Sequence, residues 1–134
     1  MKKVLIKNAK IVNENKITEG DVFIENGIIV EIAESISAKS PDVIIYDAEG
    51  TYLIPGLIDD QVHFREPGLT HKENIETGSK AAVAGGITTF IEMPNTLPQA
   101  TTEELLEDKF SIAEETSYAN YSFMFGGTND NLAE

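Results

Sequence analysis

The chain has 134 residues, 41% hydrophobic composition and a formal net charge of −13 at pH 7. This length and apolar content suit a folded protein with one modest core and exclude a disordered chain. The acidic excess argues against nucleic acid or an anionic membrane surface as a partner. A small anionic substrate is not excluded, because distant carboxylates are screened over about 8 to 10 Å and a local arginine can still bind an anion.

The sequence contains no cysteine, which excludes disulfides and thiolate metal sites. Histidine, carboxylate and amide side chains remain as possible metal ligands. The first apolar run is interrupted at Lys7, well short of a signal-peptide core or a membrane span. We therefore expect a cytoplasmic protein.

Short runs rich in Val and Ile, separated by polar residues, fill positions 3–53. They predict an all-β segment with strands at 4–7, 10–13, 21–26, 28–32, 43–47 and 51–54. Asn26-Gly27 lies between two of these runs and predicts a hairpin with a type I′ turn, because both residues tolerate positive φ. Gly50 is expected to end another tight turn.

The pattern changes after Pro55-Gly56 to alternating strands and helices. Strands are expected at 57–64, 87–93 and 121–126, and helices at 72–84 and 102–116. Alternation of this kind implies a parallel sheet and an α/β fold. Thr70 with Glu73 and Thr101 with Glu104 fit capping boxes that would begin the two helices.

The change of pattern predicts two domains, a small β-module at 1–54 and the first βαβαβ units of a larger fold at 55–134. Three parallel strands cannot close a barrel, which typically needs eight strands and about 250 residues. We therefore expect either the N-terminal piece of a longer protein or a protein whose missing units come from another chain. We favour the first.

Polar residues follow each expected parallel strand, where side chains in such folds converge on one crevice. Asp59, Gln61, His63 and Arg65 alternate along the first strand, so their side chains are expected to share one face. An isolated histidine is usually a core or loop residue. An imidazole beside an amide and an arginine is instead a candidate ligand of a divalent metal.

Two further side chains at these strand ends are candidates for substrate binding. The Arg65 guanidinium could be a solvated surface cation, yet its planar fork suits two-point recognition of a carboxylate. Asn95 could close a turn in the segment Met-Pro-Asn-Thr or bind substrate through its amide. Glu92, inside the second parallel strand, is expected to be a structural partner of other residues.

The motifs PGLID, HFREPG, AGGITT, MPNT and GGTNDN resemble those of the cyclic amidohydrolases, most closely the dihydroorotases, over essentially the whole chain. The resemblance implies a (β/α)8 TIM-barrel metal-dependent hydrolase with a small β-sandwich module. This chain would hold the N-terminal part of the module and the first three barrel strands.

The family resemblance also implies an activity, the interconversion of dihydroorotate and N-carbamoyl-L-aspartate in pyrimidine biosynthesis. It places the catalytic aspartate and most metal ligands on later strands. No catalytic residue is therefore expected within this chain, and the 134 residues alone are expected to be inactive.

Residue by residue, the resemblance assigns His63 as a metal ligand and Arg65 with Asn95 as binders of the substrate carboxylate. Gln61 stands where the family usually has a first histidine, and a side-chain amide is a weaker zinc ligand than imidazole. Asp59 would contact the metal ligands and not the metal ion itself. We expect zinc, one or two ions per complete chain with fewer than two bound tightly, a small anionic substrate and a homo-oligomeric complete protein.

Two other functions stay open. The glutamine at position 61 would also fit a catalytically silent homologue that keeps the fold as a scaffold for a partner enzyme. A sister amidohydrolase acting on hydantoin, allantoin or dihydropyrimidine would share most of these motifs. Arg65 favours the acidic substrate, because allantoinases usually have asparagine there and dihydropyrimidinases lack the Arg-Glu-Pro-Gly block.

Overall fold

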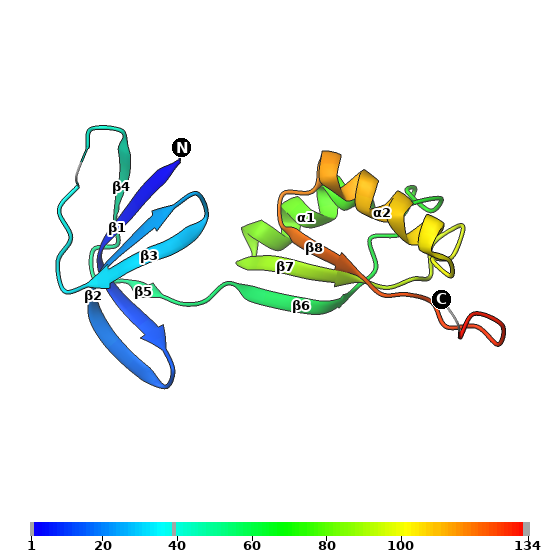
Figure 1. The fold of residues 1–134 in the computed structure, drawn as a ribbon, viewed down its shortest axis with the longest axis horizontal. Helices are drawn as coiled ribbons and strands as arrows, with labels where there is room; N and C mark the ends of the chain where they lie inside the picture. Colours follow the sequence, from blue (N-terminus) through cyan, green and yellow to red (C-terminus); the bar gives the residue numbers. More distant parts are fainter. Residues whose placement is uncertain (1, 39, 133–134) are drawn as a thin grey trace. The chain divides into compact units, whose positions relative to one another are not determined.

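The computed structural model describes residues 2–38 and 40–132. The chain divides into two compact units, Met1–Pro55 and Gly56–Glu134. Among the described residues, the regular elements of the first unit are all strands, and α1 and α2 both belong to the second unit (Figure 1). Neither helix of this described part is long and apolar enough to cross a membrane.

The first unit is one five-stranded sheet with the order β3-β2-β1-β4, and β5 also pairs with β1. Its strands are β1 (Lys3–Asn13), β2 (Lys16–Glu25), β3 (Ile28–Ala33), β4 (Val43–Asp47) and β5 (Tyr52–Leu53). The first three are antiparallel neighbours, whereas β4 and β5 run parallel to β1. The all-β prediction for this segment is confirmed.

Two details of the first unit differ from the sequence prediction. The runs 4–7 and 10–13 form one long strand, β1, in which Asn8 has a φ of 55° and the register with β2 shifts between Ile6 and Ala9. Residues 16–20, which fell outside the predicted strands, extend β2, because they pair across the hairpin with β1. The turn at Asn26-Gly27 is confirmed, with φ values of 52° and 81°.

A buried carboxylate holds the irregular part of β1 in place. Asp21 is 2% exposed and accepts hydrogen bonds from the backbone N–H groups of Asn8 (2.9 Å) and Ile36 (2.8 Å). Lys7 Nζ lies 3.4 Å from Asp21 Oδ2, the oxygen that also accepts from Ile36. The Ile36 N–H, more than any other contact, lowers the pKa of Asp21 from its ordinary value. This side chain therefore links β1, β2 and the segment after β3.

The second unit is α/β, as predicted, with a parallel sheet of order β6-β7-β8. Its elements are β6 (Leu57–Val62), α1 (Ile75–Ala84), β7 (Ile87–Glu92), α2 (Glu103–Thr116) and β8 (Asn120–Phe123). Both helices cover the same face of the sheet (Figure 1). The core between helices and sheet is built around Ile75, Phe90, Ala113 and Phe123.

The first helix begins later than predicted, at Ile75, and the expected capping box of Thr70 with Glu73 is wrong. Asn74 is the N-cap, and its side chain accepts from the Thr77 N–H at 2.8 Å. Glu73 precedes the helix and accepts from the Asn74 N–H at 2.9 Å. Asparagine is a better N-cap than threonine, which agrees with the helix beginning after Asn74 and not after Thr70.

The second helix has its cap one residue later than predicted. The Thr102 hydroxyl accepts from the Leu105 N–H at 3.3 Å, so the pairing of Thr101 with Glu104 is wrong. Only Thr101 has an acidic residue three positions later, Glu104, whereas Leu105 stands three positions after Thr102, so the capping-box pattern favoured the wrong threonine. The helix end at Thr116 agrees with the prediction.

Candidate functional site

Three of the polar candidates, His63, Arg65 and Asn95, lie on two loops that follow the neighbouring parallel strands β6 and β7, whereas Asp59 and Gln61 lie on β6 itself. The loops are joined by backbone hydrogen bonds from Met93 N to Val62 O (3.0 Å) and from Leu97 N to Pro67 O (3.1 Å). Gly68 has a φ of 85°, and a Cβ there would collide with the Leu97 carbonyl oxygen. The two loops are therefore packed backbone against backbone at the carboxyl ends of their strands.

His63 and Asn95 meet across these loops. His63 Nδ1 lies 2.9 Å from Asn95 Oδ1, and both side chains are exposed. Because a carbonyl oxygen only accepts, this contact assigns the proton to Nδ1 and leaves the lone pair on Nε2. The Asn95 amide then still has its two Nδ2 hydrogens to donate. The contact therefore leaves His63 with a lone pair for a metal ion and Asn95 with donors for a substrate carboxylate, which are the groups that their expected roles require.

Arg65 follows His63 by two residues, but the structure does not place it as the sequence predicted. Strand β6 ends at Val62, and Arg65 has a φ of 71°, so the alternation that put four side chains on one strand face does not continue to it. Its backbone N–H donates to Glu92 Oε1 at 2.8 Å. The side chain is half-buried, and its guanidinium takes part in no hydrogen bond or ion pair within residues 2–38 and 40–132. It has five donors available for an anion.

A buried ion pair lies directly beneath the two loops. Lys109 Nζ is 2.9 Å from Glu92 Oε2, and each side chain is 1% exposed. Lys109 Nζ also donates to the Met93 carbonyl at 3.0 Å and lies 5.0 Å from the centre of the Phe123 ring. Burial outweighs the attraction of Lys109 and raises the pKa of Glu92.

Sequence reasoning missed Lys109, although a signal was present. The residue is three positions after Leu106 and four before Ala113, which puts it on the apolar stripe of α2 rather than its charged face. The surrounding run Glu-Asp-Lys made it look like an ordinary surface charge.

Three of the candidates line two separate hollows. Asp59 and His63 line one hollow together with Phe64, Glu73 and small residues of α1. Asn95 lines another with residues that follow β7 and β8, among them Gly126 and Gly127.

Gln61 lines neither of these hollows. It is exposed, and its backbone N–H donates to Asp59 Oδ1 at 3.2 Å. The structure therefore puts Asp59 and His63 in the wall of one hollow, and no hydrogen bond joins Gln61 to the imidazole in the described part of the chain.

The metal-binding prediction can be tested against the donors present. Within the described residues, no group of three or more His, Cys, Asp or Glu side chains could hold a metal ion. Zinc in proteins takes about four ligands or three ligands and a water. His63 Nε2 fits as one ligand, but these residues do not make a complete site.

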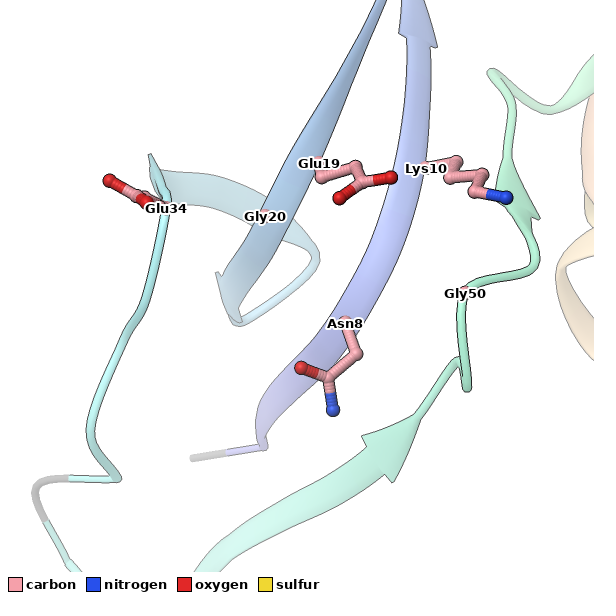
Figure 2. A pocket seen from close by; sticks show the side chains of 6 residues that line it. All are labelled: Asn8, Lys10, Glu19, Gly20, Glu34 and Gly50. Atoms are coloured by element: carbon pink, nitrogen blue, oxygen red, sulfur yellow. The ribbon is translucent and has the colours of Figure 1, made fainter.

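The first unit has a hollow of its own, lined by Asn8, Lys10, Glu19, Gly20, Glu34 and Gly50. Figure 2 shows Lys10 and Glu19 side by side on β1 and β2, where they are register partners. The Asn8 amide already donates to Asp47 Oδ1 at 2.9 Å. Charges of both signs, with no imidazole among them, favour no particular ligand, so the loops after β6 and β7 are the better candidate.

Comparison with known proteins finds relatives that match most or all of the chain. A family model described as "Dihydro-orotase-like" matches residues 50–126. The chain is 42% identical over 132 residues to a dihydroorotase of Methanosarcina acetivorans, which covers 98% of the chain and 28% of that protein. It is 55% identical over 97 residues to a dihydroorotase of Carboxydothermus hydrogenoformans, which covers 71% of the chain and 22% of that protein.

A solved structure shares the same architecture. An L-hydantoinase (dihydropyrimidinase) from Arthrobacter aurescens superposes with a TM-score of 0.92 and 32% identity, covering 100% of this chain and 30% of that one. The chain thus spans less than a third of the length of these relatives.

Proposed function

The chain belongs to the dihydro-orotase-like family of cyclic amidohydrolases, and from this premise we propose that it forms the N-terminal part of a dihydroorotase. The complete enzyme would interconvert dihydroorotate and N-carbamoyl-L-aspartate in pyrimidine biosynthesis, in the cytoplasm, as a homo-oligomer. The second unit would supply the first three strands of a (β/α)8 barrel, and the first unit part of a β-sandwich module. The parallel order β6-β7-β8, with a helix in each connection, supports the barrel.

The contact between His63 Nδ1 and Asn95 Oδ1 carries the proposal. The contact leaves the two Nδ2 hydrogens of Asn95 free to donate, and the Arg65 guanidinium takes part in no hydrogen bond or ion pair in the described part of the chain. An amide donor and a planar guanidinium fork together suit a carboxylate. We assign Arg65 and Asn95 as the residues that bind the substrate carboxylate.

Holding the carboxylate at two points would orient the substrate ring. When binding fixes the substrate in one orientation, less rotational freedom remains to be lost on the way to the transition state. The half-buried position of Arg65 strengthens its attraction for an anion, because fewer waters screen the charge. This is the contribution that the chain's own residues can make to turnover.

For the metal, we propose zinc with His63 Nε2 as one ligand, Gln61 as a weak ligand at most, and Asp59 as a supporting neighbour. Zinc would polarise the ring carbonyl and lower the pKa of a water molecule. Because Gln61 replaces an imidazole, the complete gene product should bind fewer than two zinc ions tightly per chain. Elemental analysis after mild chelation measures this, and two retained ions would refute it.

Kinetics of the complete gene product with Arg65→Met test the substrate assignment. We expect kcat/KM for dihydroorotate to fall by about 100-fold or more, because the main partner of the carboxylate is lost. Turnover of dihydrouracil, which has the ring without the carboxylate, should not fall. Arg65→Lys, which keeps the charge without the fork, should lie between Arg65→Met and the unsubstituted enzyme. An unchanged kcat/KM for dihydroorotate in Arg65→Met would remove the assignment.

The structural likeness to an L-hydantoinase keeps a sister activity as the second candidate. The same assay separates the two functions. An enzyme that turns over dihydrouracil or hydantoin faster than dihydroorotate, and does so independently of Arg65, would be the sister hydrolase. Absence of turnover of every ring, with metal bound, would instead favour a silent scaffold.

A further inference from the structure

The buried pair Glu92 and Lys109 touches both loops that carry the proposed carboxylate clamp. Glu92 Oε1 accepts from the Arg65 N–H at 2.8 Å, and Glu92 Oε2 lies 2.9 Å from Lys109 Nζ. Lys109 Nζ donates to the carbonyl of Met93 at 3.0 Å, two residues before Asn95. A continuous chain of polar contacts thus runs from the backbone of Arg65 to the segment that carries Asn95.

We infer that Glu92 is a positioning residue, which holds the backbone of Arg65 in the arrangement relative to the Met93–Asn95 segment that an anion-binding clamp requires, and that Lys109 supplies its counter-charge. Neither side chain touches the substrate in this account. The inference rests on the proposed function, because it assumes that Arg65 and Asn95 act together on one carboxylate.

The backbone of Arg65 needs such support. A φ of 71° lies in the left-handed region, which is unfavourable for a residue with a long side chain and persists only where surrounding contacts determine it. The hydrogen bond from its N–H to Glu92 is a charge-assisted one. It therefore fixes the turn that sets the direction in which the arginine side chain leaves the backbone.

The ion pair is a poor device for stability alone. Removing two charges from water is costly, and apolar side chains of similar volume in place of a buried pair are often equally or more stabilising. Here the desolvation of Glu92 outweighs its attraction to Lys109, since its pKa is raised. What an apolar pair could not supply is an acceptor for the Arg65 N–H and a donor for the Met93 carbonyl.

Two double substitutions in the complete gene product separate position from stability. Glu92→Gln with Lys109→Met removes both charges but keeps an oxygen acceptor for the Arg65 N–H. Glu92→Leu with Lys109→Met removes both charges and the acceptor, with similar side-chain volume. Neither double substitution leaves an unpaired buried charge, so both variants are expected to fold.

The first measurement is hydrogen exchange of peptides that cover residues 63–69 and 93–98, without substrate. Glu92→Leu/Lys109→Met should speed exchange in the first peptide by about 10-fold or more, because the hydrogen bond of the Arg65 amide is lost. Glu92→Gln/Lys109→Met should retain slow exchange there. Equal exchange in the two doubles would overturn the inference whatever the kinetics show.

The second measurement is a split of KM and kcat for dihydroorotate. The leucine double should raise KM by about 10-fold or more, since a small misplacement of a binding group is costly, while the glutamine double stays within about threefold of the unsubstituted enzyme. A loss of kcat in both doubles that parallels their loss of folded protein would overturn the positioning role.

The two proposals can fail separately. If exchange separates the doubles but Arg65→Met does not change turnover of dihydroorotate, the clamp assignment is wrong and the positioning of the Arg65 turn stands. If Arg65→Met abolishes turnover but the doubles behave alike in exchange and KM, the clamp stands and the positioning role falls.

Discussion

Asp21 in the first unit and Glu92 in the second are 2% and 0% exposed, yet their partners affect the pKa of the carboxyl group in opposite directions. Asp21 accepts from two backbone N–H groups and lies beside Lys7, and its pKa is lowered. Glu92 accepts from one backbone N–H and faces a buried lysine, and its pKa is raised. The first carboxylate is stabilised by its partners, whereas the second is held at a net cost.

This difference distinguishes Asp21, whose charge stabilises the fold, from Glu92, whose charge serves the candidate functional site. Backbone N–H groups that would otherwise be unsatisfied make Asp21 favourable to the fold of its sheet. An unfavourable buried carboxylate persists when something other than stability requires it, and perturbed ionisable groups cluster at functional sites. Glu92 contacts the backbone of Arg65, which is where such a requirement arises.

The largest effect is expected from breaking the pair in the second unit. Glu92→Leu alone leaves Lys109 buried without a counter-charge and should lower the free energy of unfolding by about 3 to 5 kcal/mol. Adding Lys109→Met should restore most of that loss. Chemical denaturation of the complete gene product measures both variants, and a single substitution that costs no more than the double would contradict the account.

A smaller loss is expected in the first unit. Asp21→Asn keeps the shape but offers one accepting oxygen to three donors, so it should lower the free energy of unfolding by about 1 to 3 kcal/mol. Lys7→Met, which removes only the more distant donor, serves as the control and should cost less. Equal losses would mean that the ion pair, and not the backbone N–H groups, stabilises Asp21.

The two carboxylates should also respond oppositely to pH. The lowered pKa of Asp21 means that its stabilisation is present above its ordinary value of 3.8 and is lost as pH falls through the folded value. The raised pKa of Glu92 means that stability falls as pH rises from its ordinary value of 4.5 towards the folded value.

Melting temperatures across this range test the opposite signs. The melting temperature of the unsubstituted protein should exceed that of Asp21→Asn by less as the solution becomes more acidic. The melting temperature of Glu92→Gln/Lys109→Met, relative to that of the unsubstituted protein, should increase as pH rises. Parallel changes in both differences would break the comparison.

The smallest effect concerns the helix caps that place the loops. Asn74→Ala and Thr102→Ala should each lower the free energy of unfolding by about 1 kcal/mol, because one N–H of the first turn loses its partner. Ser111→Ala is the control, since its hydroxyl only bonds back to the Glu107 carbonyl within α2 and its loss should be nearly neutral. Caps that cost no more than this control would show that other contacts fix the helix starts.

The sequence was sufficient for the order of elements, except that it divided β1 into two strands. Apolar periodicity is a local signal, so the strand runs, both helices and the Asn26-Gly27 turn could be placed without tertiary information. The start of α1 could not, because its first N–H groups are satisfied from outside the helix. The Ile75 N–H donates to Glu66 Oε2 at 2.8 Å, a contact that only the folded loop provides.

The candidate site shows the same division. The residue types His63, Arg65 and Asn95 could be identified along the chain, because strand ends collect polar groups in parallel sheets. The left-handed turn at Arg65 could not, since nothing local marks a positive φ in an arginine. The burial of Lys109 depends on how α2 packs on the sheet, and that packing is a property of the whole unit.

A crystal structure of the complete gene product with bound N-carbamoyl-L-aspartate tests the central claim most directly. The account predicts a ligand carboxylate within hydrogen-bond distance of the Arg65 guanidinium and of Asn95 Nδ2, with Glu92 Oε1 still accepting from the Arg65 N–H. A carboxylate bound elsewhere, with Arg65 turned to solvent, would contradict it.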